Sequence, residues 1–352
     1  MQGGADHRRV GHVDVGLDPE GVVVGGPLER AYVACSRSNA VTVVDLDGMV
    51  VTGRIGVGRE PIDIVYDEPS GRLFTADARS DQVSVVDAAS EEVTGTVAVG
   101  SYPAGLGLDQ EARRLYCGDT MSSTMTVIDT DSLEVVATVP AELGAGAVAV
   151  DTRRGRAYCV NFLSRSVTVV DTSTNEAVGR IPVGEGACAV AVNPCLDEVY
   201  VVNSLASTVA RIDALSGEVT GELIVPNAPV GLAAGPAGDR IYVGNRGDGT
   251  LSVLGVDGTE WARIPVGRGP GGVAVHPTHP RRLLVANAGS GSLSVVDDLT
   301  TGPPDSRIGD AVHPIVGRRL PDFCLPELHS GKLRHSHEWA ERKYIINFFA
   351  SW

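Results

Sequence analysis

Two arginines, Arg37 and Arg79, stand 42 residues apart, each within a short run of polar residues typical of a turn. A guanidinium group carries a planar set of N–H donors that matches a carboxylate or a phosphate. The chemistry suggested by these residues is therefore recognition of an anion. The positions at later multiples of 42 carry no arginine and read Met121, Leu163, Leu205, Gly247 and Gly289.

Metal and catalytic motifs are less evident. His276-Pro-Thr-His279 and His335-Ser-His337 are the two histidine pairs, and neither has cysteines or carboxylates at a specific ligand spacing. We therefore expect no metal site. No Ser/His/Asp motif, phosphate loop or paired-carboxylate motif is recognisable, and no cofactor is expected, although an active site built from distant repeats would leave no local motif.

The interval of 42 residues runs through most of the chain. The run Val41-Thr-Val-Val-Asp45 returns in seven copies that end at Asp45, Asp87, Asp129, Asp171, Asp213, Gly255 and Asp297. A second column is Tyr32, Phe74, Tyr116, Tyr158, Tyr200, Tyr242 and Leu284. A third is Cys35, Asp77, Asp119, Asn161, Asn203, Asn245 and Asn287, whose side chains we expect to accept hydrogen bonds in the turn after the second strand.

One period contains four short β-type runs, at 62–66, 72–76, 82–87 and 92–99, separated by clusters of turn residues. A four-stranded unit repeated every 40 to 45 residues is the signature of a β-propeller blade. The last copy lacks its fourth strand after Asp297, whereas residues 8–16 keep the pattern of a spare one. We therefore expect an all-β, seven-bladed propeller over residues 8–297 that is closed by its N-terminal strand.

Three runs carry a family resemblance: Ala157-Tyr-Cys-Val-Asn161, Val199-Tyr-Val-Val-Asn203 and Ile241-Tyr-Val-Gly-Asn245. With the Val-x-Val-Ile-Asp and Ile-x-Val-Gly-x-x-Pro patterns that follow, they resemble the YVTN repeat. The resemblance implies a seven-bladed propeller. It implies no particular reaction, because a fold is not a function.

Propellers commonly bind ligands where loops converge at the mouth of the central channel. The candidates in those loops are Arg37, Arg59, Arg79, Tyr102, Phe162, Arg165, Arg246 and Arg268, accompanied by Glu60, Asp81, Met121, Glu185 and Asp248. The functional interpretation is a site for a protein, a peptide or a small anionic ligand. The competing interpretation is a solvated loop face, since exposed arginines are ordinary.

The charge and the cysteines exclude several classes of function. The net charge of the whole chain is −15. Residues 302–352 hold six acids and seven bases, so the remaining 301 residues carry a net charge of about −16. This negative charge disfavours nucleic-acid binding. No apolar run approaches a membrane span, and the start of the sequence has no signal-peptide core, so a cytoplasmic protein without membrane contact is expected. The six cysteines are expected to be reduced, because Cys117 and Cys159 share a column in adjacent blades, about 10 Å apart.

A second segment follows an expected linker at 298–314. This segment resembles the opening of a thioredoxin-like redoxin domain. The resemblance rests on Leu320-Pro-Asp-Phe323, a helix-like stretch at 336–342 and the run from Tyr344 to Trp352. In that family the next residues are Cys-x-x-Cys, and here the sequence ends at Trp352. The expected domain is 315–352, an incomplete thioredoxin-like segment.

Three functions fit these observations. The first is a binding scaffold that presents a partner to a thioredoxin-like thiol-disulfide oxidoreductase module, which would gain from the raised effective concentration. The second is a propeller enzyme of lyase or transferase type, with its site at the channel mouth. The third is a purely structural interaction protein.

Overall fold

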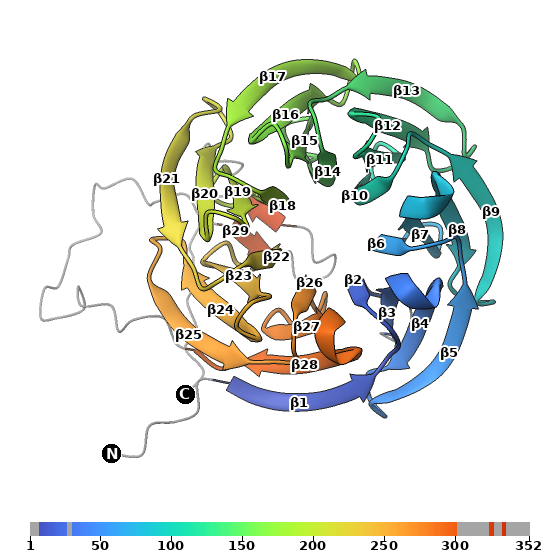
Figure 1. Ribbon diagram of the computed structural model, residues 1–352. Coiled ribbons are helices and arrows are strands. Elements are labelled where there is room, and N and C mark those ends of the chain that lie inside the picture. Colours follow the sequence, from blue (N-terminus) through green and yellow to red (C-terminus); the bar gives the residue numbers. More distant parts are fainter. Residues whose placement is uncertain (1–6, 27–29, 301–323, 327–332, 336–352) are drawn as a thin grey trace, which may run out of the picture.

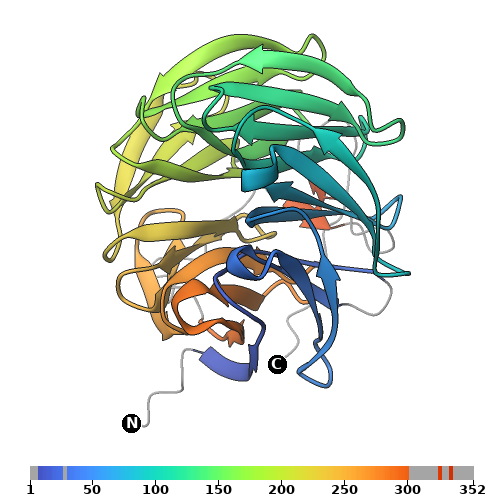
Figure 2. The same ribbon diagram turned by 45° about the vertical axis from the view of Figure 1, so that its right-hand side comes forward.

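The computed structural model describes residues 7–26 and 30–300, together with two short strands, β29 (Cys324–Pro326) and β30 (Leu333–His335). The strands of the long segment form seven four-stranded antiparallel sheets, arranged as blades around a ring (Figure 1). Figure 2 shows the blades obliquely, as twisted sheets that follow one another around the ring. The expected all-β, seven-bladed propeller is confirmed.

The first strand of each blade lies nearest the ring axis: β2 (Pro19–Gly25), β6 (Pro61–Asp67), β10 (Pro103–Asp109), β14 (Ala145–Asp151), β18 (Ala187–Asn193), β22 (Pro229–Ala234) and β26 (Pro270–Val275). The second strands are β3 (Arg30–Cys35), β7 (Arg72–Asp77), β11 (Arg114–Asp119), β15 (Arg156–Asn161), β19 (Glu198–Asn203), β23 (Arg240–Asn245) and β27 (Arg282–Asn287). The third strands are β4 (Ala40–Asp45), β8 (Gln82–Asp87), β12 (Thr124–Asp129), β16 (Ser166–Asp171), β20 (Thr208–Asp213), β24 (Thr250–Gly255) and β28 (Ser292–Asp298). The outermost strands are β5 (Val50–Gly56), β9 (Glu92–Ala98), β13 (Val135–Pro140), β17 (Glu176–Pro182), β21 (Val219–Ile224), β25 (Glu260–Pro265) and β1 (His7–Asp14). Three single-turn 3₁₀ helices, η1 (Ser36–Ser38), η2 (Ala78–Ser80) and η3 (Ala288–Ser290), join second and third strands.

The side-chain pattern explains the order of the strands. Strand β7 is buried along nearly its whole length, because it packs against other blades on both faces, and its buried residues include Leu73 and Phe74. Strand β9, at the rim, exposes most of its residues. The strand ranges predicted for residues 58–100 agree with β6 to β9 within one residue at each end.

Ring closure is made by the N-terminal strand. Strand β1 pairs antiparallel with β28, with Val13 opposite Leu293, and completes the sheet of β26 and β27. Figure 1 shows this join, where β1 lies outside β28 at the rim. The predicted closure is confirmed, and it leaves the third strand of the last blade with a partner on each side.

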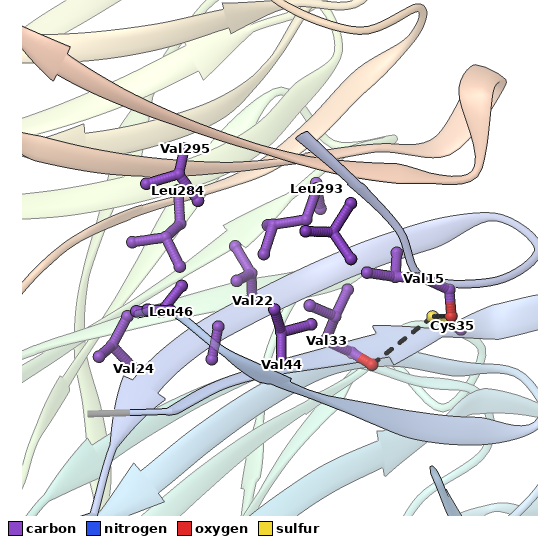
Figure 3. Close-up of a cluster of buried hydrophobic side chains, with 13 residues drawn as sticks. Val15, Val22, Val24, Val33, Cys35, Val44, Leu46, Leu284, Leu293 and Val295 are labelled. Atoms are coloured by element: carbon purple, nitrogen blue, oxygen red, sulfur yellow. Dashed lines mark hydrogen bonds between the residues drawn. The ribbon is translucent and has the colours of Figure 1, made fainter. Parts of the chain in front are cut away.

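The core lies between the blades. Figure 3 shows the cluster at the closing join, where Val22, Val33 and Val44 of one blade meet Leu284 and Leu293 of the last. At the other interfaces the aromatic column fills the same role. Tyr116, for example, is fully buried against the following blade.

The Asp/Asn column acts one loop away from the expected place. The Asp77 carboxylate accepts a hydrogen bond from the backbone N–H of Gly58, at 3.1 Å, and another from the Thr75 hydroxyl, at 2.8 Å. Asn161 and Asn287 likewise accept from backbone N–H groups of residues that precede an innermost strand. These three members of the column therefore fasten the loop before the first strand of their own blade to the second strand, rather than capping the turn after the second strand.

No disulfide forms among the five cysteines whose side chains are described, namely Cys35, Cys117, Cys159, Cys188 and Cys195. In the same part of the chain, no helix is long and apolar enough to span a membrane. Strands β29 and β30 pair antiparallel, with Cys324 opposite His335. The rest of the predicted redoxin segment and most of the predicted linker at 298–314 lie outside the described residues.

Candidate functional site

Two loops of every blade meet at one end of the ring, which we call the loop face. The inner loop precedes the innermost strand, and the hairpin loop joins the second and third strands. In the blade of β6 to β9, the Ala78 N–H of the hairpin loop donates to the Glu60 carbonyl oxygen of the inner loop, at 2.9 Å. The equivalent bond is present in all seven blades, at 2.9–3.0 Å. All the predicted site residues lie in these loops, so the structure brings them to one face.

The residue that accepts this bond has a left-handed backbone in every blade. The φ values are Asp18 50°, Glu60 57°, Tyr102 58°, Gly144 82°, Gly186 74°, Ala228 49° and Gly269 60°. Glycine adopts this conformation freely, whereas a residue with a side chain loses about 1–2 kcal/mol in it. The side chains of Asp18, Glu60 and Tyr102 are therefore kept where glycine would fit better. Such strained positions cluster at functional sites.

Glu60 and Tyr102 belong to a network that links two neighbouring blades. The Tyr102 hydroxyl donates to the Glu60 carboxylate at 2.8 Å, and Glu60 also pairs with Arg79. The backbone N–H of Tyr102 donates to the Asp81 carboxylate at 2.8 Å. Burial raises the pKa of the Tyr102 phenol, and the hydrogen bond to Glu60 raises it further. The network holds the Tyr102 ring in place and neutralises Arg79.

A second ion pair crosses an entire blade. The Arg246 guanidinium, in the hairpin loop between β23 and β24, lies 2.6 Å from the carboxylate of Glu20 on β2. The Glu20 side chain passes over Gly271, where an added Cβ would lie 2.9 Å from Glu20 Oε2. Burial raises the pKa of Glu20, although Arg246 opposes that shift. The pair therefore links the blade of β2 to β5 with the blade of β22 to β25. It passes over the last blade, which lies between them.

The other predicted arginines differ in their partners. Arg37 pairs with Asp18 at 2.8 Å, and Arg165 pairs with Glu185. The Arg59 guanidinium donates to the backbone carbonyl of Arg79, at 2.8 Å. Within the described part of the chain, neither Arg59 nor Arg268 has a carboxylate partner, and both are exposed. We call these two residues the cationic sector. They occupy equivalent positions in the inner loops of two blades, and the first blade, β2 to β5, lies between those two.

Sequence reasoning named Phe162 and Met121 but did not identify the apolar part of this face to which they belong. Met121, Leu143, Leu163 and Leu205 expose 63–71% of their surface, and Phe162 exposes 37%. They lie on loops of three consecutive blades, those of β10 to β13, β14 to β17 and β18 to β21. We call these five residues the apolar sector. For Met121, Leu163 and Leu205 the signal was already present in the sequence, because they replace Arg37 and Arg79 in one column with an apolar side chain.

Asp63 was also missed. It stands on β6 in an axial column whose other members are glycine or alanine: Gly21, Gly105, Ala147, Ala189, Gly231 and Gly272. Small residues suit this column because innermost strands approach closely, and a Cβ added to Gly105 would lie 2.4 Å from Ala147 Cα. The Asp63 carboxylate accepts from the backbone N–H of Leu106 on the next blade, at 2.8 Å, and burial raises its pKa to about 6. Comparison of the repeats along the first strand would have singled it out.

No group of three or more potential metal ligands occurs among the residues with described side chains. The loop face offers charged, aromatic and exposed apolar side chains for recognition.

Comparison with known proteins agrees with this architecture. No curated protein matches the chain. Among solved structures, Kuenenia stuttgartiensis hydrazine synthase is similar, with a TM-score of 0.74 and 21% identity over 86% of this chain and 99% of that chain. At that identity the likeness shows the fold alone. A family profile described as YNCE-like beta-propeller matches residues 8–235. The chain therefore belongs to the YNCE-like beta-propeller family.

Proposed function

We propose that this protein is a binding scaffold whose loop face recognises an extended protein segment with apolar side chains and a carboxylate. The observation that carries the proposal is the apolar sector of Met121, Leu143, Phe162, Leu163 and Leu205. Large exposed apolar side chains gathered on consecutive loops mark interaction surfaces more often than solvated ones.

The position of the charges supports a segment rather than a small anion. The cationic sector, Arg59 and Arg268, lies on the inner loops of the second and last blades, whereas the apolar sector lies on the third to fifth. A ligand that touches Arg268 as well as the apolar sector must extend across the face. The remaining predicted arginines are already paired with carboxylates, so they are less available to bind an anionic ligand. They are Arg37, Arg79, Arg165 and Arg246.

The proposal is tested with a phage-displayed library of random 12-residue peptides, selected on the full 352-residue chain. Selected peptides are expected to combine apolar residues with an acidic one. Binding should weaken at least tenfold in the Leu163→Ser, Leu205→Ser double variant, as measured by fluorescence anisotropy. Leu215→Ser is the matched control, because Leu215 is as exposed, at 73%, and lies in the turn between β20 and β21 at the other end of the ring.

Charge variants separate the two groups of arginines. Arg59→Ala with Arg268→Ala should remove the preference for an acidic residue, and Arg37→Ala with Arg79→Ala should have a smaller effect. Failure to select any peptide, or equal binding by the serine variant and its control, would overturn the proposal.

The sequence supports two finer features of this function. The repeat columns resemble YVTN repeats, and the segment from Leu320 to Trp352 resembles the start of a thioredoxin-like oxidoreductase module to which the scaffold would deliver its partner. The cytoplasmic location expected from the sequence belongs to the same proposal. The module is tested by sequencing the coding region after Trp352, where Cys-x-x-Cys is expected. Any other continuation would remove the redox part and leave the binding part intact.

A lyase or transferase is the alternative that has an observation in its favour. Asp63 lies on an innermost strand with a pKa raised to about 6, which suits a general acid or base.

A further inference from the structure

The turn after β26 departs from the same turn in the other blades. In four blades it begins with a side-chain oxygen, that of Asp67, Asp109, Asp151 or Asn193. In three of these blades the oxygen accepts a hydrogen bond from a backbone N–H group two or three residues later, as at Asp109, Asp151 and Asn193. In the last blade this position is His276, and the turn is one residue longer. The longer turn brings a second imidazole, that of His279, back over the first.

The two imidazoles face each other through the same ring atom. His276 Nδ1 and His279 Nδ1 are 3.3 Å apart, and the rings meet edge to face with their centroids at 4.7 Å. The Thr278 hydroxyl lies 3.1 Å from His279 Nδ1 and 3.4 Å from His276 Nδ1. His276 is buried, with 1% of its surface exposed, whereas His279 is exposed to solvent.

The turn favours an unprotonated nitrogen at this point. The backbone N–H of Thr278 points to His276 Nδ1, at 3.4 Å, as backbone N–H groups point to the carboxylates in other blades. A neutral imidazole that accepts at Nδ1 carries its proton on Nε2. That tautomer leaves the Nδ1 lone pair unprotonated, 3.3 Å from His279 Nδ1, and a bound ion would displace the long hydrogen bond from the Thr278 N–H.

The separation of the nitrogens matches that of two ligands on one ion. Zinc binds imidazole nitrogens at about 2.0–2.1 Å in a tetrahedral arrangement, so two such nitrogens lie about 3.3–3.4 Å apart. We propose that His276 and His279 form a two-histidine site for a divalent transition metal ion. Water completes the coordination on the exposed side of His279, and the Thr278 hydroxyl lies within reach as a neutral partner.

The sequence predicted no metal site, because it lacks the ligand spacing of a structural zinc site, and the two-histidine site departs from that prediction. A structural site needs four protein ligands, and a two-ligand site with bound water is weaker and exchanges its metal. Imidazole ligands suit zinc, nickel and copper, and affinity for divalent ions peaks at copper. We therefore expect reversible binding in the order copper, then nickel or zinc, without a requirement for metal in folding.

Calorimetric titration of the metal-free protein with zinc chloride and nickel chloride tests the site. The background is the full chain with His335→Gln, His337→Gln and Cys324→Ser, which removes the second histidine pair and the cysteine nearest to it. His279→Gln should remove one equivalent of bound metal, or weaken its binding at least tenfold. His276→Asn should do the same while the turn persists, because Asn193 holds the equivalent position in another blade. His12→Gln, on β1, is the control and should leave the titration unchanged.

A second readout locates the bound metal. Long-range ¹H–¹⁵N spectra should show zinc-induced shifts at the Nδ1 atoms of His276 and His279 and none at His12. Equal stoichiometry and affinity in the background protein and the His279→Gln variant would overturn the site, as would shifts confined to other histidines. In that outcome, the contact of 3.3 Å is a hydrogen bond between a protonated and an unprotonated nitrogen.

Discussion

Asp63 is the residue whose chemistry departs most from its column. Six other blades place glycine or alanine there, and Asp63 adds a carboxylate beside the backbone of the next blade. Burial disfavours the charged form, so the pKa of Asp63 is raised from 3.8 to about 6. The folded protein therefore binds a proton more tightly at this site than the unfolded chain does.

The sign of the pH dependence follows from this shift. Because the folded pKa exceeds the unfolded one, the contribution of Asp63 to stability falls as pH rises from about 4 to about 6 and stays low above that. Asp63→Ala, which copies Ala147 in the same column, should remove this slope. The difference in unfolding free energy between wild type and variant should change by at most about 3 kcal/mol between pH 4 and pH 7, at 1.36 kcal/mol per pKa unit. Urea unfolding across this range measures it, and parallel curves for the two proteins would contradict the assignment.

The 42-residue repeat predicts which residues share a face of the candidate site, but not which charges are paired there. The 42-residue interval places Arg37, Arg59 and Tyr102 on one face, because equivalent loops must lie at equivalent places in a ring. It does not predict which arginines are neutralised. That depends on side chains from other columns, such as Asp18 for Arg37, and on pairs like Glu20 and Arg246 that are 226 residues apart in sequence.

At the scale of elements, the strands were predictable and their ends were fixed by turns. Each outer hairpin is capped by an aspartate such as Asp87, which accepts from the backbone N–H groups of Ala89 and Ser90. The left-handed inner loops were not predictable where the glycine is missing, as at Glu60 and Tyr102. There a tertiary network overrides the local preference.

The prediction at the scale of elements concerns the contribution of strand β1 to stability. Deletion of residues 1–14 should lower the unfolding free energy by at least about 3 kcal/mol, because Val13 loses its buried site, Val15 loses the strand that positions it and β28 becomes an open edge. Deletion of residues 1–6, which precede the strand, is the control and should leave stability unchanged. Urea unfolding gives the free energies, and sedimentation should reveal self-association through the new edge. A 1–14 deletion that unfolds with the wild-type midpoint and stays monomeric would mean that the join is dispensable.

At the scale of the whole molecule, the thiols report on the integrity of the ring. Burial raises the pKa of Cys159 and of Cys188 to about 12, and that of Cys117 also rises. A thiol reacts as its thiolate, so almost no reactive form exists at neutral pH. In the Cys324→Ser protein, the five described thiols should react with Ellman's reagent at least 100-fold more slowly than after unfolding in urea. Cys188, which is only partly buried, should react first. Prompt modification of several thiols in native buffer would show that the blades separate readily.

The closing strand also has a consequence for synthesis of the chain. Strand β1 leaves the ribosome well before its partner β28, which begins 285 residues later, at Ser292 against His7. At about 5–20 residues per second, translation of that interval takes roughly 15 to 60 s. During this time the early blades can form in succession, but the N-terminal strand has no template and must stay available. The nascent protein therefore passes through an open arc with two unsatisfied ends, and the timing of chaperone protection should matter more for this ring than for a fold of local contacts.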